Sequence, residues 1–147
     1  MKYNDIRRPA RAVHIGRVTV GGNAPIAIQS MTNTDPHDVA ATLSQIRALA
    51  AAGCDVVRLT VPDREAAETV RVIKESGVQI PIVADIHFDY RLALLCAEYG
   101  VDKIRINPGN IGGEDRVRAE ADACRARHIP ISIGVNTGSL EKHIQQK

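Results

Sequence analysis

Short apolar runs alternate along the chain with stretches in which apolar residues repeat every three or four positions. Such short runs predict buried strands, and the repeated spacing predicts helices with one apolar face. The expected strands cover residues 25–30, 55–61, 80–86, 101–106 and 129–135. The expected helices begin at residues 34–36, 63, 89, 114 and 138. The pattern is therefore a repeated strand followed by a helix.

The segments between these elements are typical of helix ends. Thr34 or Asp35 is expected to cap the first helix, with Pro36 in its first turn. Asp63 is expected to cap the second helix. The first three helices are each followed by a residue that commonly ends a helix, namely Gly53, Gly77 and Gly100. Residues 12–22 alternate weakly and end in two glycines, which indicates a small capping hairpin outside the core.

A chain of strand–helix repeats predicts an α/β protein with a parallel sheet. Two architectures fit the pattern: a five-stranded doubly wound sheet, and a partial (β/α)₈ barrel of about five units. A doubly wound sheet gathers its ligands from few loops, whereas here nearly every strand carries polar residues at its carboxyl end. This difference favours the barrel.

Polar residues follow the apolar part of four consecutive strands at a spacing of two, so that each set shares one strand face. The sets are Arg58 with Thr60, Asp85 with His87, Arg105 with Asn107, and Ser132 with Gly134 and Asn136. In a barrel, the carboxyl ends of the strands form the catalytic face. The repetition predicts a site for a small, anionic, oxygen-rich ligand, in which arginines supply charge and asparagines supply neutral donors.

A different interpretation is that each of these polar residues has its own partner within the protein and that they form no common site. Arg58 would then pair with Asp85, His87 would be a core histidine, and the asparagines would cap turns. The loop at residues 107–113, NPGNIGG, is open to the same two interpretations. It offers free backbone N–H groups beside Arg105 for a phosphate, or it is an ordinary turn above an arginine paired with a carboxylate.

Composition excludes several classes of function. Lys+Arg 19 and Asp+Glu 17 give a net charge of +2, and aromatic residues make up 3% of the 147 residues. This does not suggest nucleic-acid binding, and no phosphate-loop or dinucleotide motif suggests nucleotide binding. No apolar run approaches the roughly 20 residues of a membrane span, and no secretory signal is recognisable, which indicates a cytoplasmic protein. Cys54, Cys96 and Cys124 are scattered, so we expect inert thiols and no metal site.

Five long segments of the chain resemble 4-hydroxy-3-methylbut-2-en-1-yl diphosphate synthase of the non-mevalonate isoprenoid pathway. They lie at residues 7–34, 54–62, 80–94, 100–116 and 129–143, in the family's order. VADIHFDYR at 83–91 and RINPGNIG at 105–112 are the most specific.

The resemblance implies a (β/α)₈ barrel that binds a cyclic diphosphate, and a C-terminal domain with a 4Fe–4S cluster. The family's enzymes are oxidoreductases that open and reductively dehydroxylate 2-C-methyl-D-erythritol 2,4-cyclodiphosphate. Flavodoxin or ferredoxin donates the electrons, and the enzyme is a homodimer. By position, the resemblance implies that Arg58, Arg105, Asn107 and Asn136 hold the diphosphate, and that Asp85 and His87 line the same pocket.

The chain departs from the family in two respects. Ser132 stands where the family usually has an arginine, and residues 1–147 end after the fifth predicted strand. We therefore expect an incomplete substrate-binding barrel without the iron–sulfur domain, inactive alone and prone to self-association. The other functions considered are a stand-alone phosphate-binding α/β module without redox activity, and a different enzyme on a phosphate-binding barrel, such as a pterin-binding methyltransferase.

Overall fold

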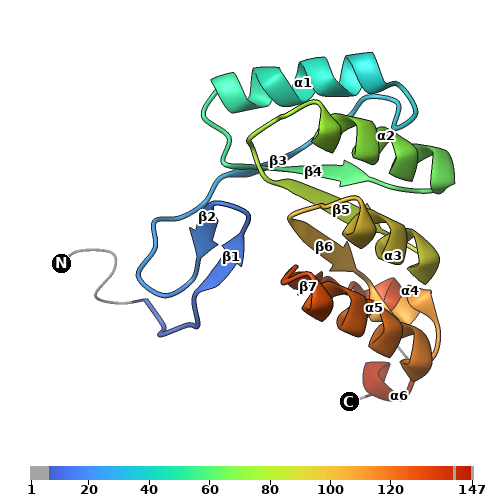
Figure 1. Ribbon diagram of the computed structural model, residues 1–147. Coiled ribbons are helices and arrows are strands. Elements are labelled where there is room, and N and C mark those ends of the chain that lie inside the picture. Colours follow the sequence, from blue (N-terminus) through green and yellow to red (C-terminus); the bar gives the residue numbers. More distant parts are fainter. Residues whose placement is uncertain (1–6, 141, 147) are drawn as a thin grey trace.

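The computed structural model describes residues 7–140 and 142–146, and its central element is a five-stranded parallel sheet (Figure 1). The strands are β3 (Gln29–Met31), β4 (Val56–Thr60), β5 (Ile82–Ile86), β6 (Lys103–Ile106) and β7 (Ile131–Ile133). Each strand pairs with the next one in the sequence, in the order β3-β4-β5-β6-β7. A doubly wound sheet would reverse this order at a switch point. The sequential order therefore confirms the open, partial barrel.

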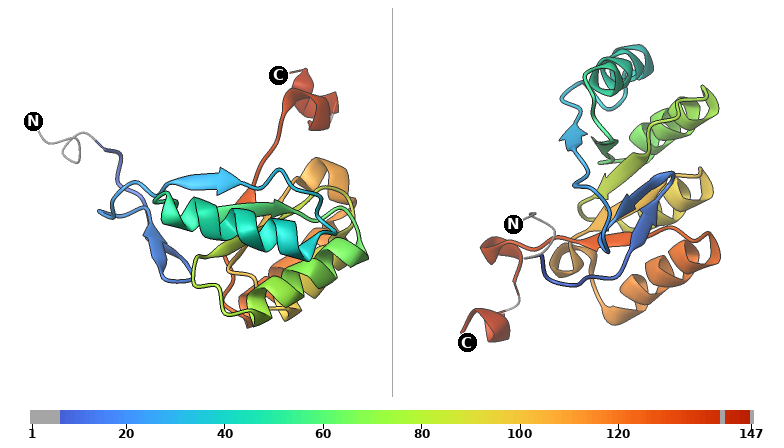
Figure 2. Two further views of the ribbon diagram at one scale, coloured as in Figure 1. Left: turned by 90° about the horizontal axis from the view of Figure 1, so that it is seen from above. Right: turned by 90° about the vertical axis from the view of Figure 1, so that its left-hand side faces the viewer.

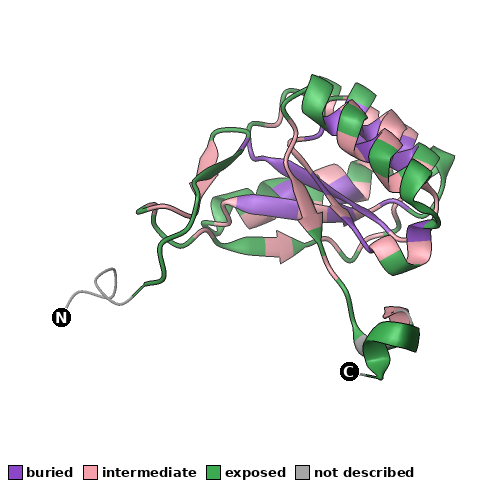
Figure 3. Ribbon diagram, turned by 90° about the horizontal axis from the view of Figure 1, so that it is seen from below, coloured by how far each residue is buried: buried purple, intermediate pink, exposed green. Residues whose placement is uncertain are grey.

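Four long helices connect these strands and lie along one face of the sheet (Figure 2). They are α1 (Val39–Ala51), α2 (Arg64–Glu75), α3 (Tyr90–Glu98) and α5 (Glu114–Ala126). Every second residue of a strand points toward the helices. Leu59, Ala84 and Ile104 are examples, and they pack with Ile46 and Ile73 of the helices in the main core. The buried residues accordingly follow the strands and the helix sides that face them (Figure 3). We call the face of the sheet that the helices cover the outer face, and the opposite one the inner face.

The N-terminal hairpin closes the amino-terminal end of the inner face. Its strands β1 (Val13–Ile15) and β2 (Val18–Val20) pair antiparallel, as the sequence predicted. Ile15 is buried against Val56, the first residue of β4, and against Val83 in β5. The hairpin therefore contributes a small second core, contrary to the expectation that it lies outside any core.

The helix ends follow the sequence prediction except at α1. Asp63 and Asp89 cap α2 and α3, and Gly53, Gly77 and Gly100 all have positive φ after their helices. At α1, however, the N-cap is Asp38, whose carboxylate accepts from the amide of Ala41. Asp35 instead accepts from the amide of His37, and its carbonyl accepts from the amide of Asp38. These two bonds form a turn through Pro36, which delays the start of the helix.

The edge strands are shorter than the sequence predicted. Residues 25–28 precede β3, and Ile26 and Ile28 are exposed because no further strand or helix covers them in the described part of the chain. The predicted loop at 107–113 contains one helical turn, α4 (Pro108–Ile111). The expected last helix is divided into a 3₁₀ helix (Thr137–Ser139) and the short α6 (Lys142–Gln145), and Glu141 between them lies outside the described residues. None of the helices described here has the length and apolarity needed to cross a membrane.

Candidate anion-binding site at the strand ends

Asp85 is the centre of a charged cluster on the inner face. It lies near the end of β5, its side chain is 2% exposed, and three side chains approach it. Arg105 donates from Nη1 to its Oδ1 at 3.0 Å. Arg58 Nε and His87 Nε2 each lie 3.6 Å from its Oδ2. One carboxylate therefore holds two guanidinium groups from the strands on either side.

Strand register brings these residues together. Asp85 is paired directly with Arg105 and with Thr60, and Arg58 lies two residues before Thr60. Because side chains alternate along a strand, Arg58, Asp85 and Arg105 all point away from the helices. The spacing of two that was read from the sequence therefore corresponds to a shared face in the structure.

Arg58 retains an unused donor inside this cluster. Its Nη2 contacts the sulfur of Met31 at 3.4 Å, but its Nε is buried and has no hydrogen-bond partner. The 3.6 Å separation from Asp85 is too long for a good hydrogen bond. Buried donors in folded proteins are almost always paired, so this N–H is available to an acceptor that enters the inner face.

Arg105 leans over β7, where Gly134 makes room for it. A Cβ added at Gly134 would lie 2.5 Å from Nη2 and 2.6 Å from Nε of Arg105. Any side chain at position 134 would displace the guanidinium group. The glycine thus leaves room for the guanidinium group of Arg105, whose partner in the register is Ser132.

The two asparagines cap turns, as one of the sequence interpretations held. Asn107 is 3% exposed, accepts from the amide of Gly109 and donates to the hydroxyl of Ser139 at 2.8 Å. Asn136 accepts from the amide of Ser139, which completes a capping box. The amide of Gly109 is therefore engaged, which reduces the set of free backbone donors expected in this loop. Ser139 joins the two loops, and no local sequence pattern pointed to it.

His87 is not a core residue. Its side chain is 41% exposed and follows β5 at the rim, where it tilts against the exposed ring of Phe88. The histidine can therefore meet a ligand on the inner face. Sequence reasoning missed one further charged residue there, Lys103, which lies two residues before Arg105 on the same face of β6.

The cysteines do not form a metal site within the described residues. No group of three or more His, Cys, Asp or Glu side chains in this part of the chain is placed to hold a metal ion. Burial raises the pKa of Cys96 to about 12 and that of Cys124 to about 11, so both remain neutral thiols. Cys54 donates to backbone carbonyls. Iron–sulfur clusters are usually held by four cysteine thiolates. The chain has three cysteines, and in the described residues they belong to no group of three or more metal ligands, so they do not fit a cluster.

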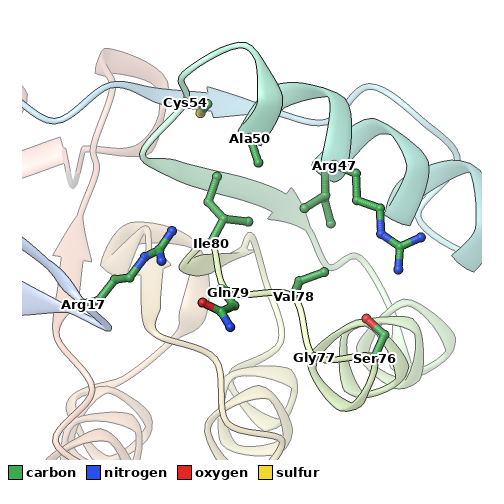
Figure 4. Close-up of a pocket in the computed structure, with 10 residues that line it drawn as sticks. Arg17, Arg47, Ala50, Cys54, Ser76, Gly77, Val78, Gln79 and Ile80 are labelled. Atoms are coloured by element: carbon green, nitrogen blue, oxygen red, sulfur yellow. The ribbon is translucent and has the colours of Figure 1, made fainter.

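A separate cavity of about 250 Å³ lies near the amino-terminal ends of β4 and β5, away from the charged cluster (Figure 4). Arg17 and Arg47 lie on its two sides, with Ala50 and Ile80 between them. In barrel enzymes the ligand lies at the carboxyl ends of the strands. The cluster around Asp85, rather than this cavity, is therefore the candidate site.

The fold and this cluster define the class of protein: a (β/α) barrel, open in the described chain, that gathers charged side chains at the carboxyl ends of its strands. Comparison with known families identifies the particular one. The family described as the GcpE TIM-barrel domain matches residues 10–147, and the chain belongs to this family.

Three curated relatives are each named 4-hydroxy-3-methylbut-2-en-1-yl diphosphate synthase (flavodoxin). The protein from Azotobacter vinelandii is 65% identical over 141 residues, which are 96% of this chain and 38% of the relative. That from Pseudomonas aeruginosa is 63% identical over 142 residues, 97% of this chain and 38% of the relative. That from Pseudomonas syringae is 64% identical over 141 residues, with 96% and 38% covered. The chain thus spans about two fifths of the length of these relatives, and the family resemblance read from the sequence is confirmed.

Proposed function

We propose that this chain is the diphosphate-binding part of a 4-hydroxy-3-methylbut-2-en-1-yl diphosphate synthase, and that its ligand is 2-C-methyl-D-erythritol 2,4-cyclodiphosphate. The observation that carries the proposal is the charge of the inner face. Two arginines surround one buried carboxylate, and one of them has a buried N–H without an acceptor. A cyclic diphosphate supplies anionic oxygens that such donors bind well.

Each residue has a role that follows from its position. Arg58 and Arg105 neutralise the phosphates, and Asp85 holds both guanidinium groups in place before the ligand arrives, which reduces the entropy lost on binding. His87, exposed at the rim, contacts the ring or its oxygens. Asn107 and Asn136 cap the loops at the strand ends, and Asn136, which is exposed, also contacts a phosphate.

The reaction of the proposed enzyme takes up two electrons and two protons, opens the ring, and releases a hydroxyl group as water. A 4Fe–4S cluster would supply the electrons, received from flavodoxin, which the relatives' names mention, or from ferredoxin. Because the cysteines of this chain do not fit a cluster, its ligands would be residues outside the chain. The described residues account for ligand binding alone.

The proposal is tested by calorimetric titration of the complete gene product with the cyclic diphosphate. We expect binding in the wild type and none that is measurable for Arg105→Ala, since this change removes a cation and leaves Asp85 less well paired. Arg118→Ala is the matched control, because Arg118 is exposed on α5 and pairs with Glu114. Unchanged affinity in Arg105→Ala contradicts the site.

The same titration distinguishes the substrate-binding part of the synthase from a stand-alone phosphate-binding module. A wild type that does not bind the cyclic diphosphate contradicts the proposed substrate. Inorganic diphosphate bound as tightly as the cyclic compound would instead indicate the phosphate-binding module without redox activity.

A further inference from the structure

Lys103 is a third cation on the inner face. In β6, Ile104 and Ile106 are buried in the main core, so Lys103 and Arg105 point to the opposite face. The register pairs Val83 with Lys103 on one side and with Arg58 on the other. Lys103 therefore lies level with Arg58, one layer below the row formed by Asp85 and Arg105.

Among the residues that the structure describes, Lys103 has no partner of opposite charge. Within the described residues it makes no hydrogen bond or ion pair, whereas Lys74, the other partly buried lysine, bonds Asp102 at 2.8 Å. Burial, and then the charge of Arg58, lower the pKa of Lys103. Lysines are rarely buried without pairing. The carboxylate on this face, Asp85, is already shared between two arginines.

The described strands of the inner face consequently carry an excess of two positive charges. Arg58, Lys103 and Arg105 face one carboxylate, and Asp85 alone cannot neutralise them. A cyclic diphosphate has one ionised oxygen on each phosphate and therefore brings two negative charges. The ligand and the inner face are matched in charge only when Lys103 is counted.

Ser132 is a small, neutral neighbour of Lys103 on the inner face. It is paired with Arg105 across β6 and β7, so it lies on the inner face diagonally above Lys103. Two residues along a strand span roughly 7 Å, about the reach of the four-carbon stem of lysine. The small neutral serine stands where the resembled family usually has an arginine.

We propose that Lys103 binds a phosphate of the ligand at the place that an arginine at position 132 would occupy. The inference rests on the proposed function and adds a residue to that site. The ammonium group donates to a phosphate oxygen below Arg105, while Arg58 and Arg105 hold the remaining oxygens. The positive charge absent at position 132 is thus supplied from the neighbouring strand.

The test is a double-mutant cycle on the complete gene product, read by calorimetric titration with the cyclic diphosphate. Lys103→Met should weaken binding about tenfold or more, because a charged hydrogen bond to phosphate is lost. Adding Ser132→Arg to this variant should restore most of the affinity. Lys103→Arg should retain it, and Arg118→Ala, the exposed control on α5, should leave it unchanged.

Each result decides between the proposals. If the wild type does not bind the ligand, the proposed function fails before Lys103 is considered. If it binds, but Lys103→Met binds equally well with the same dependence on salt, the role of Lys103 is wrong.

Ser132→Arg alone provides a test that does not require Lys103→Met to fold. If Lys103 already fills the position, the added arginine should change affinity less than about threefold, since two residues that serve one position are not additive. A gain of tenfold or more over the wild type would show that the position was empty, and would overturn the proposal.

Discussion

Two buried carboxyl groups of the described chain lie in opposite environments. Asp85 is 2% exposed and remains paired with arginines. Glu120, on α5, is 1% exposed, and neither of its oxygens has a hydrogen-bond partner. Burial raises the pKa of Glu120 to about 7. The first carboxylate is stabilised by charges on the inner face, whereas the second is held among apolar groups and favours its neutral form.

Glu120 makes the stability of the fold depend on pH. Its pKa rises from an ordinary 4.5 to about 7 on folding, so between these values the folded state binds more protons than the unfolded state. Stability therefore falls as pH rises through this window, by on the order of 3 kcal/mol, and the loss is complete above the folded pKa.

Replacing Glu120 by Gln should reduce this loss. We expect the free energy of unfolding of Glu120→Gln to change less between pH 5 and pH 8, which denaturant titrations at several pH values measure. His37, whose pKa is raised by its hydrogen bond to Asp63, is present in both proteins, so its contribution to the pH dependence is the same in both. The difference between variant and wild type is therefore the informative quantity. Parallel pH profiles would contradict the role of Glu120.

Among the elements, the start of α1 shows how a cap is chosen. Both Asp35 and Asp38 are able to cap a helix, but Pro36 and His37 form a turn that uses Asp35. Asp38 is left to accept from Ala41 at 2.9 Å. Replacing Asp38 by Ala should lower the free energy of unfolding by about 1 kcal/mol.

The comparison variant is Asp35→Ala, for which a smaller loss of about 0.5 kcal/mol or less is expected, because its bonds lie outside the helix. Chemical denaturation followed by circular dichroism measures both. A larger loss for Asp35→Ala than for Asp38→Ala would place the cap where the sequence alone suggested it.

Elements that depend on local chemistry were predictable from the sequence. The apolar runs and the helix-ending glycines located β4, β5, β6 and three of the four long helices to within a few residues. The edge strands were less predictable, because the length of an edge strand depends on the partner beside it and not on its own residues. In the site, the spacing of Asp85, Arg105 and Arg58 predicted their common face.

Two features of the site were beyond local patterns. Ser139 bonds Asn107 from 32 residues away, and only the folded chain brings them together. Lys103 has the same spacing from Arg105 as Asn107 has, but it lies on the amino-terminal side of Arg105, within the apolar part of the strand and not at its carboxyl end. Its unpaired charge is visible only when the neighbouring carboxylates are known to be engaged elsewhere.

At the scale of the whole molecule, the sheet is an arc with two edges. β3 and β7 each pair with one neighbour in the described chain. Apolar side chains are exposed beside both edges: Ile26 is 81% and Ile28 60% exposed near β3, and Ile133 is 69% and Val135 55% exposed near β7. Unpaired strand edges with apolar neighbours are templates for association with another chain.

The 147-residue chain alone should therefore self-associate. We expect its apparent mass in sedimentation velocity to rise with concentration over the micromolar range, because edges and apolar patches that are tolerated at low concentration meet more often at high concentration. Ile133→Lys together with Val135→Lys should reduce the association, since charged side chains discourage edge pairing. Lysine at two exposed helix positions away from the strand edges, Ser44 on α1 and Ala126 on α5, provides a charge-matched control that leaves the apolar surface in place. A wild-type chain that sediments as a monomer at every concentration would show that the arc protects its own edges.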